Sequence, residues 1–160
     1  MTLFGRCLHR SDVTRTDPTR SATRSPVWKL EGLSDYDIRR PLVPSGTNLL
    51  GLIKHLASVE LGYFGDTFWR PFDEPLPWLD EGAAPNADMW ATAAESRQEI
   101  IGLYQRVWHH ADITIGSLAL DSVTRVPWWP PDRSEVTLHR FGGANERKVG
   151  AVRLALFTTR

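Results

Sequence analysis

The chain has 160 residues, of which 41% are hydrophobic, and this length and composition predict one globular domain with its own core. A single cysteine, Cys7, excludes an internal disulfide framework, and no apolar run approaches the roughly 20 residues that a membrane span requires. The basic first 30 residues lack the apolar stretch of a secretory signal, so we expect a cytoplasmic protein.

The formal net charge of zero conceals an uneven distribution. Residues 1–29 carry six basic and two acidic side chains, and residues 139–160 carry five basic and one acidic, so the stretch between them has a net charge of −8. Basic ends can bind nucleic acid, but these lack interleaved aromatics and flank an acidic body that repels phosphate. We therefore expect no nucleic-acid partner, and we interpret residues 1–26 as a disordered or loosely packed basic segment.

Residues 27–160 are expected to form the folded domain. The segment WKLEGL, residues 28–33, is typical of the last turns of a helix. Residues 34–44 are interpreted as a connector, because Pro41 and Pro44 interrupt regular structure.

An amphipathic helix is expected next, ending at Phe64. Ser45, Thr47 and Asn48 can each cap its first turn. At about 100° per residue, one face gathers the apolar side chains Leu49, Leu52, Ile53, Leu56, Val59, Tyr63 and Phe64. His55 lies at the edge of this stripe, where a histidine can ligate a metal or simply hydrogen-bond across the core.

A long acidic loop rich in proline and tryptophan, residues 65–87, precedes the next expected helix, Met89–Leu118. Asp88 is its expected N-cap. Its apolar face is predicted to contain Trp90, Ala94, Ile101, Tyr104, Trp108, Ala111 and Ile115. Arg97 shares this face and is a candidate partner for Glu60, because a carboxylate inside an apolar stripe needs a partner.

Histidines are the main candidates for chemistry. His109 and His110 are neighbours on one helix and cannot both bind one ion, so we expect them to be solvated. A catalytic metal site generally has three protein ligands, and His139 is the most plausible partner for His55. Cys7 has no obvious base, and no nucleophile-elbow or phosphate-loop motif is present.

The segment DSVTRVPWWPP, residues 121–131, is a second aromatic loop. It either walls an apolar pocket or closes the end of a helical bundle, and we favour the second interpretation. Residues 132–135 have the spacing of a capping box, so a fourth helix is expected to begin there. Gly142 and Gly143 would soon interrupt that helix.

Two of these segments together resemble the DinB-like superfamily: WKLEGLSDYDIRRPLVPSGTNLLGLIKHLASVELGYF and ALDSVTRVPWWPPDRSEVTLHR. The resemblance covers residues 27–140, including the Trp-rich loop and the helix between the two segments. The closer similarity is to actinobacterial DinB-like domains of unknown function, which are similar to mycothiol- and bacillithiol-dependent transferases and isomerases. The resemblance implies an all-α fold, namely a four-helix bundle with long loops and, here, a shortened or altered fourth helix. It also implies a homodimer.

The resemblance further implies a divalent metal, such as Zn or Ni, with His55 as its first ligand. In the family the other ligands come from the fourth helix, as a histidine, a glutamate and an Arg-His-x-Gly-His run. This chain instead reads FGGANERKVGAVRLA from Phe141 onward and has no histidine after His139. We therefore expect an incomplete site, with the metal bound poorly or absent. A shifted reading frame at both ends is one explanation, which the encoding DNA would test.

The expected function is that of the family, a metal-dependent transferase or isomerase that uses a low-molecular-weight thiol on a small-molecule substrate. The incomplete site predicts little such activity. The alternative is a non-catalytic binding or oligomerisation module that uses the bundle surface.

Overall fold

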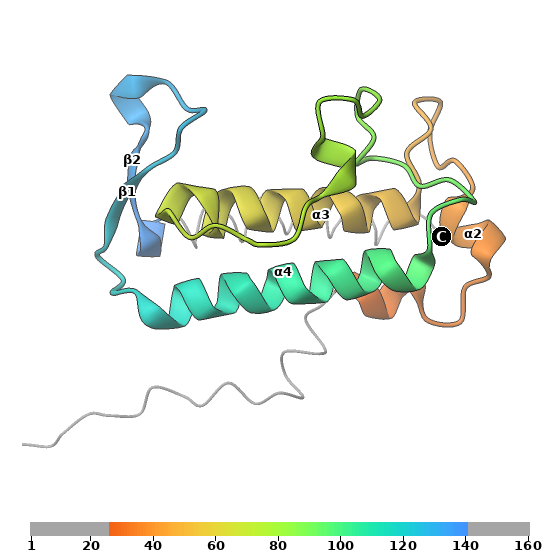
Figure 1. The fold of residues 1–160 in the computed structure, drawn as a ribbon, viewed down its shortest axis with the longest axis horizontal. Helices are drawn as coiled ribbons and strands as arrows, with labels where there is room; N and C mark the ends of the chain where they lie inside the picture. Colours follow the sequence, from red (N-terminus) through yellow and green to blue (C-terminus); the bar gives the residue numbers. More distant parts are fainter. Residues whose placement is uncertain (1–25, 141–160) are drawn as a thin grey trace, which may run out of the picture.

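The computed structural model of the protein describes residues 26–140. Two helices, α3 (Leu49–Phe64) and α4 (Arg97–Ser117), lie side by side and run in the same direction (Figure 1). The connection between them, residues 65–96, returns along α3 before α4 begins (Figure 1). It contains two short 3-10 helices, η2 (Asp66–Phe68) and η3 (Pro77–Leu79). The expected predominance of helix is confirmed, although a small hairpin accompanies it.

The segment before α3 differs from the prediction. WKLEGL does not continue a helix. Its first three residues end the 3-10 helix η1 (Pro26–Leu30), and a turn follows in which Gly32 has a φ of 75°. The expected connector contains a short helix, α2 (Asp35–Arg39). The Ser34 hydroxyl caps α2 by accepting a hydrogen bond from the Asp37 N–H. The prediction of a connector rested on the prolines and did not consider this cap.

Asn48 begins α3, as one of the three predicted caps, by accepting a hydrogen bond from the Gly51 N–H at 2.8 Å. The apolar side chains that α3 buries fully are Leu50, Ile53, Leu56, Ala57 and Phe64. This face is rotated from the predicted stripe, because the returning loop covers the side of the helix that carries Leu50 and Lys54. The predicted members Leu49, Leu52 and Val59 are only half-buried.

The predicted start of the next helix was wrong by eight residues. Ser96, and not Asp88, caps α4 by accepting from the Glu99 N–H at 3.3 Å. The predicted end near residue 118 is confirmed, since Leu118 is the C-cap. Along α4 the fully buried side chains are Ile100, Leu103, Tyr104, Val107, Ala111 and Thr114.

The expected start of a fourth helix is instead a strand. β1 (Val123–Arg125) and β2 (Glu135–Thr137) pair antiparallel, with Thr124 opposite Val136. A 3-10 helix, η4 (Pro131–Arg133), lies between them. Thr124 and Val136 are buried while their neighbours alternate outward, as the two-residue period of a strand requires. Of the described residues in which the fourth helix was expected, only residues 138–140, after β2, have α-helical backbone.

The hairpin closes one end of the helix pair (Figure 1). A small second core forms there from Phe64, Ala111, Val126, Val136 and Leu138, with Trp129 packed against it. This arrangement agrees with the interpretation that the WWPP loop closes the end of the helices. Trp128 differs from Trp129, because half of its surface is exposed.

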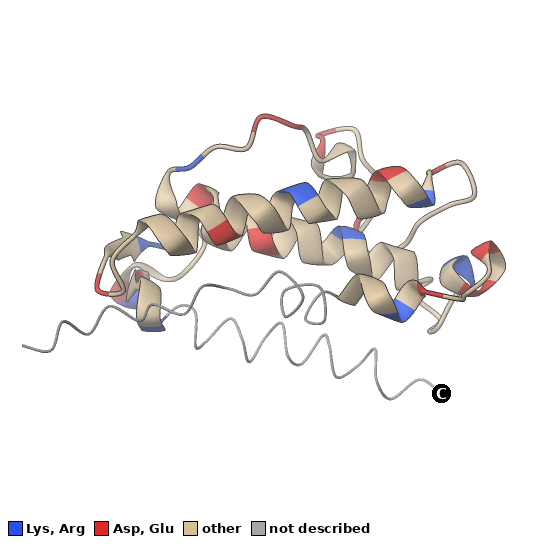
Figure 2. Ribbon diagram, turned by 90° about the horizontal axis from the view of Figure 1, so that it is seen from below, with Lys and Arg blue, Asp and Glu red and all other residues tan. Residues whose placement is uncertain are grey.

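The described body is acidic, with 16 Asp and Glu against 10 Lys and Arg in residues 26–140. Figure 2 shows its basic residues as separate positions on the helices and loops. The two basic ends that the charge count identified, and the predicted disordered segment, lie almost entirely outside the described residues. Within those residues, no helix combines the length and the apolar character that crossing a bilayer demands.

Candidate functional site

His55 is paired with Asp88. Its Nδ1 lies 2.7 Å from an Asp88 carboxylate oxygen, and both side chains are partly buried, with exposures of 31% and 19%. An ionised carboxylate can only accept, so Nδ1 carries the proton and Nε2 of the neutral ring keeps its lone pair. Among the described residues, Nε2 forms no hydrogen bond. This is the arrangement in which a carboxylate fixes the tautomer and orientation of a ligating or proton-accepting imidazole.

The loop that carries Asp88 is attached to the first turn of α3. The Asn48 N–H donates to the Met89 carbonyl oxygen at 3.2 Å, and the Asn48 side chain binds both the N–H and the carbonyl of Ala91. Asp88 therefore directly precedes a segment, residues 89–91, whose backbone is hydrogen-bonded to Asn48. Sequence reasoning identified Asn48 as one of three possible caps of α3 and Asp88 as the N-cap of the next helix. It missed their joint role because the residues from Met89 onward were expected to be helical.

Lys54 holds the same loop from the neighbouring position on α3. Its side chain is 2% exposed, and Nζ donates to Glu95 Oε1 at 2.6 Å and to the Trp90 carbonyl at 2.9 Å. The indole rings of Trp78 and Trp90 lie 5.1 and 5.7 Å from this charge. Burial by itself raises the pKa of Glu95, but hydrogen bonds from Lys54 and Thr92, with the Lys54 charge, outweigh it and lower that pKa.

The predicted Glu60–Arg97 pair was wrong. The Arg97 guanidinium donates instead to the carbonyl oxygens of Leu30 and Leu33. The reason is the direction of the helices. Because α3 and α4 run in parallel, the start of α4 lies beside the start of α3, whereas Glu60 is in the last turns of α3 (Figure 1).

The other described histidines, His109, His110 and His139, form no metal-binding group with His55. His139 is exposed beyond β2, where its backbone N–H donates to Leu120. His109 is exposed, as predicted. The prediction that His110 is solvated was wrong, since it is half-buried, with Nε2 3.0 Å from the Arg70 carbonyl oxygen and its ring 5.4 Å from that of Phe72.

His55 and Asp88 alone do not fit a three-ligand metal centre. Within residues 26–140, no group of three or more His, Cys, Asp or Glu side chains is placed to hold a metal ion. A centre of the kind that catalytic zinc occupies would therefore need further donors from outside this range. The sequence offers few of them after Arg140, where Glu146 is the only residue of these four types.

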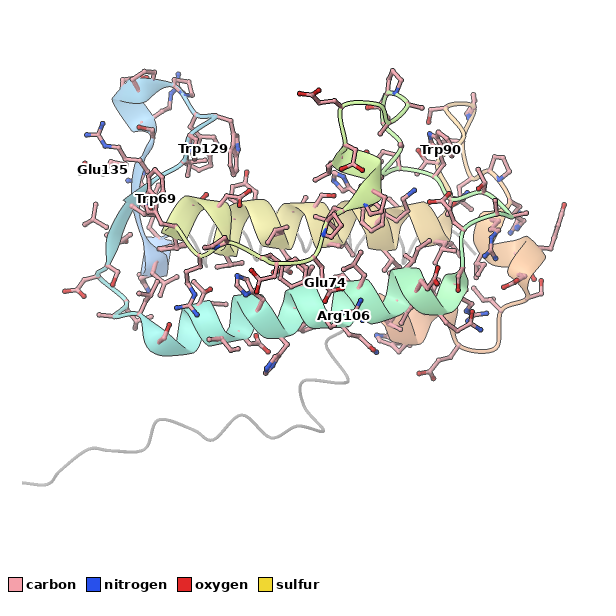
Figure 3. The ribbon with its side chains drawn as sticks, viewed as in Figure 1. Trp69, Glu74, Trp90, Arg106, Trp129 and Glu135 are labelled. Carbon is pink, nitrogen blue, oxygen red and sulfur yellow. The ribbon has the colours of Figure 1, made fainter. Side chains whose placement is uncertain are left out.

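A separate cavity of about 640 Å³ lies between residues 71–74 and α4, and it does not include His55. Glu74 and Arg106 face each other at its border (Figure 3). They form two hydrogen bonds, of 2.6 and 2.7 Å. Since both charges are satisfied by this pair, we assign the cavity no chemical role.

Comparison with known proteins gives one match. The sequence matches the family model described as Mycothiol-S-transferase over residues 19–141. No curated protein and no solved structure matches the chain. The matched range includes the whole described region and covers well over half of the chain. The resemblance to DinB-like thiol transferases is thereby confirmed, and the chain belongs to the DinB-like mycothiol-S-transferase family.

Proposed function

We propose that this protein binds a low-molecular-weight thiol of the mycothiol type at His55, and that its metal-dependent transfer activity is weak. The single observation that carries the proposal is the 2.7 Å contact between His55 Nδ1 and Asp88. This contact orients the imidazole and leaves Nε2 available to bind a ligand. The family relationship supplies the class of ligand.

The chemistry at His55 follows from this geometry. If donors from outside the described residues completed a site with His55, a divalent metal such as Zn or Ni would lower the pKa of a coordinated thiol. When no metal occupies Nε2, the chain itself supplies a base, because His55 Nε2 can accept the proton of a thiol S–H. Asp88 would then face the imidazolium that results and stabilise it. The thiolate then forms a C–S bond to an electrophilic carbon of the substrate. The group displaced by this attack, or the carbanion left by addition to a double bond, takes up the proton held by His55.

The weak metal-dependent activity is inferred from the sequence after Arg140. We propose that α3 and α4 are the two parallel middle helices of the four-helix bundle of the family. The histidine ligands of its last helix have no counterpart here, because the chain has no histidine after His139. The second candidate function, a non-catalytic binding or oligomerisation module that uses the bundle surface, is favoured by the same observation, since a site without these ligands is not expected to support metal-dependent turnover. We further propose a cytoplasmic location, where such thiols are kept reduced.

Metal analysis tests the proposed site. We expect purified protein to hold well below one Zn or Ni per chain by inductively coupled plasma mass spectrometry. We expect mycothiol, measured by calorimetric titration, to bind the wild type and to bind His55→Ala about tenfold more weakly or worse, a loss of about 1.4 kcal/mol. His109→Ala, an exposed histidine on α4, is the matched control and should bind like the wild type.

Two results would contradict parts of this proposal. One tightly bound metal per chain that is lost in His55→Ala would disprove the incomplete site and leave the family role intact. Equal mycothiol binding by the wild type and His55→Ala would exclude His55 as the thiol site. Turnover with mycothiol and an electrophilic substrate would separate the weak transferase from the binding module.

We also propose a homodimer. The support is that α4 leaves two large apolar side chains exposed on different sides of the helix, Ile113 at 43% and Ile115 at 42%. Multi-angle light scattering during gel filtration should give twice the chain mass of 18.1 kDa. Replacement of both isoleucines by lysine should shift the mass to that of one chain. A wild type that elutes as a monomer at micromolar concentration would exclude the dimer.

A further inference from the structure

Trp128 is an exposed aromatic ring at the hairpin end of the molecule. Its neighbour Trp129 packs against the second core, and Figure 3 shows Trp129 at that end, beside the end of α3. Trp128 is 51% exposed. The Tyr63 ring meets both indoles edge to face, at 5.4 and 6.5 Å between centroids. The Trp128 ring is thus held in place while half of its surface remains open to a ligand.

Trp128 lies over the face of α3 that carries His55. A Cβ atom built on Gly62 would be 3.3 Å from the edge of the Trp128 ring. A side chain at position 62 would therefore point at this indole. His55 and Gly62 are seven residues apart. Seven residues are nearly two full turns, so the two positions share one face and are separated by about 10 Å along the axis. His55 and Trp128 therefore border one strip of the α3 surface.

The residues between them suit an extended ligand. Val59 is four positions after His55 and three before Gly62, so it occupies the same strip, and it is half-buried. Gly62 has no side chain, which lets the Trp128 ring rest on the helix. The strip thus has an imidazole at one end, an aliphatic middle and an open indole face at the other.

We propose that Trp128 binds the sugar part of the thiol whose sulfur end lies at His55. This inference rests on the proposed function. Mycothiol carries its thiol on an acylated cysteine that is joined to an amino sugar and an inositol ring. The C–H face of such a ring packs on an exposed indole, while its hydroxyl groups stay in water. The acylated cysteine and the first ring have to bridge the two helical turns, about 10 Å.

The test compares thiols with and without the sugar. Calorimetric titration of the full chain with mycothiol should give a dissociation constant that rises on the order of tenfold in Trp128→Ala. Trp128→Phe keeps an aromatic face and should recover most of the affinity. N-acetylcysteine, which has the thiol and no rings, should bind the wild type and Trp128→Ala equally. Trp28→Ala, which removes a 42% exposed indole in η1, is the matched control and should leave mycothiol binding unchanged.

The outcomes separate the two proposals. If mycothiol binds and Trp128→Ala leaves its dissociation constant unchanged, the sugar site is wrong and the proposed function stands. An equal loss of mycothiol and N-acetylcysteine binding in Trp128→Ala would also overturn the sugar site, because it indicates a general distortion. If the wild type binds no mycothiol at millimolar concentration, both proposals fail. Thermal unfolding of Trp128→Phe checks that the hairpin still folds.

Discussion

Replacing Gly51 with alanine is expected to destabilise the protein by about 3 kcal/mol or more. The added Cβ would lie 2.2 Å from the Met89 carbonyl oxygen and 2.3 Å from the Trp90 backbone nitrogen. Both contacts are with backbone atoms, so no side-chain rotation can relieve them and the loop itself has to move. Because Asp88 directly precedes Met89, we also expect the His55–Asp88 contact to be disturbed and thiol binding to weaken.

Gly116→Ala is the matched control for this prediction. A Cβ at Gly116 would meet nothing within 4 Å, and alanine is favoured over glycine in a helix by up to about 1 kcal/mol. Urea unfolding followed by circular dichroism should therefore show a large loss for Gly51→Ala and a neutral or slightly stabilising effect for Gly116→Ala. Similar midpoints for the two variants would mean that the loop does not pack on α3 as described.

Lys54→Met is expected to destabilise the protein by about 2 to 4 kcal/mol. Methionine keeps much of the apolar stem but removes the donor to Glu95 and to the Trp90 carbonyl. The expected loss is somewhat below that for a fully buried ion pair, because the Glu95 side chain is 32% exposed and can recover some hydration. Urea unfolding at pH 7 measures the change.

Two controls identify the cause of that loss. The double variant Lys54→Met with Glu95→Gln should be less damaging than the sum of the single changes, since no carboxylate is left without its partner. Arg106→Met breaks the exposed pair with Glu74 and should change stability little, because solvent replaces exposed partners. Fully additive single changes would contradict direct coupling between Lys54 and Glu95.

The acid dependence of the Lys54 variant follows from the lowered pKa of Glu95. A carboxyl whose pKa is lower in the folded state stabilises the protein above its unfolded pKa of about 4.3, and this contribution is lost as pH falls. In Lys54→Met the lowering influence of Lys54 is absent. The stability difference between the wild type and Lys54→Met should therefore persist above about pH 5 and shrink as Glu95 protonates below it.

Local signals along the chain explain which elements were predictable. The helix to Phe64 was predicted with Asn48 among its caps because both its apolar period and its cap act within a few residues. The end of the next helix was found for the same reason. The order of short motifs was also sufficient for the family, which the match over residues 19–141 confirms.

The failures occur where distant partners override local preference. Residues 89–95 have apolar and alanine positions that favour a helix, yet Asn48 and Arg39 bind the carbonyl groups of Ala91 and Thr92, and this backbone forms turns and irregular loop instead. The capping-box spacing of residues 132–135 was misleading because residues 131–133 form the 3-10 helix η4, while residues 135–137 pair with β1. Neither set of partners can be recognised from the segment alone.

The sequence by itself determined the family, the helix that carries His55 and the position of that histidine at the edge of a core. Only the tertiary structure decided what His55 does there, because Asp88 is 33 residues away and is brought to Nδ1 by a loop that returns along α3. The same holds for Trp128, which reaches the His55 face through the hairpin. Helical periodicity is a property of neighbouring residues, whereas a site is a property of loops whose paths are set by buried partners such as Lys54 and Asn48.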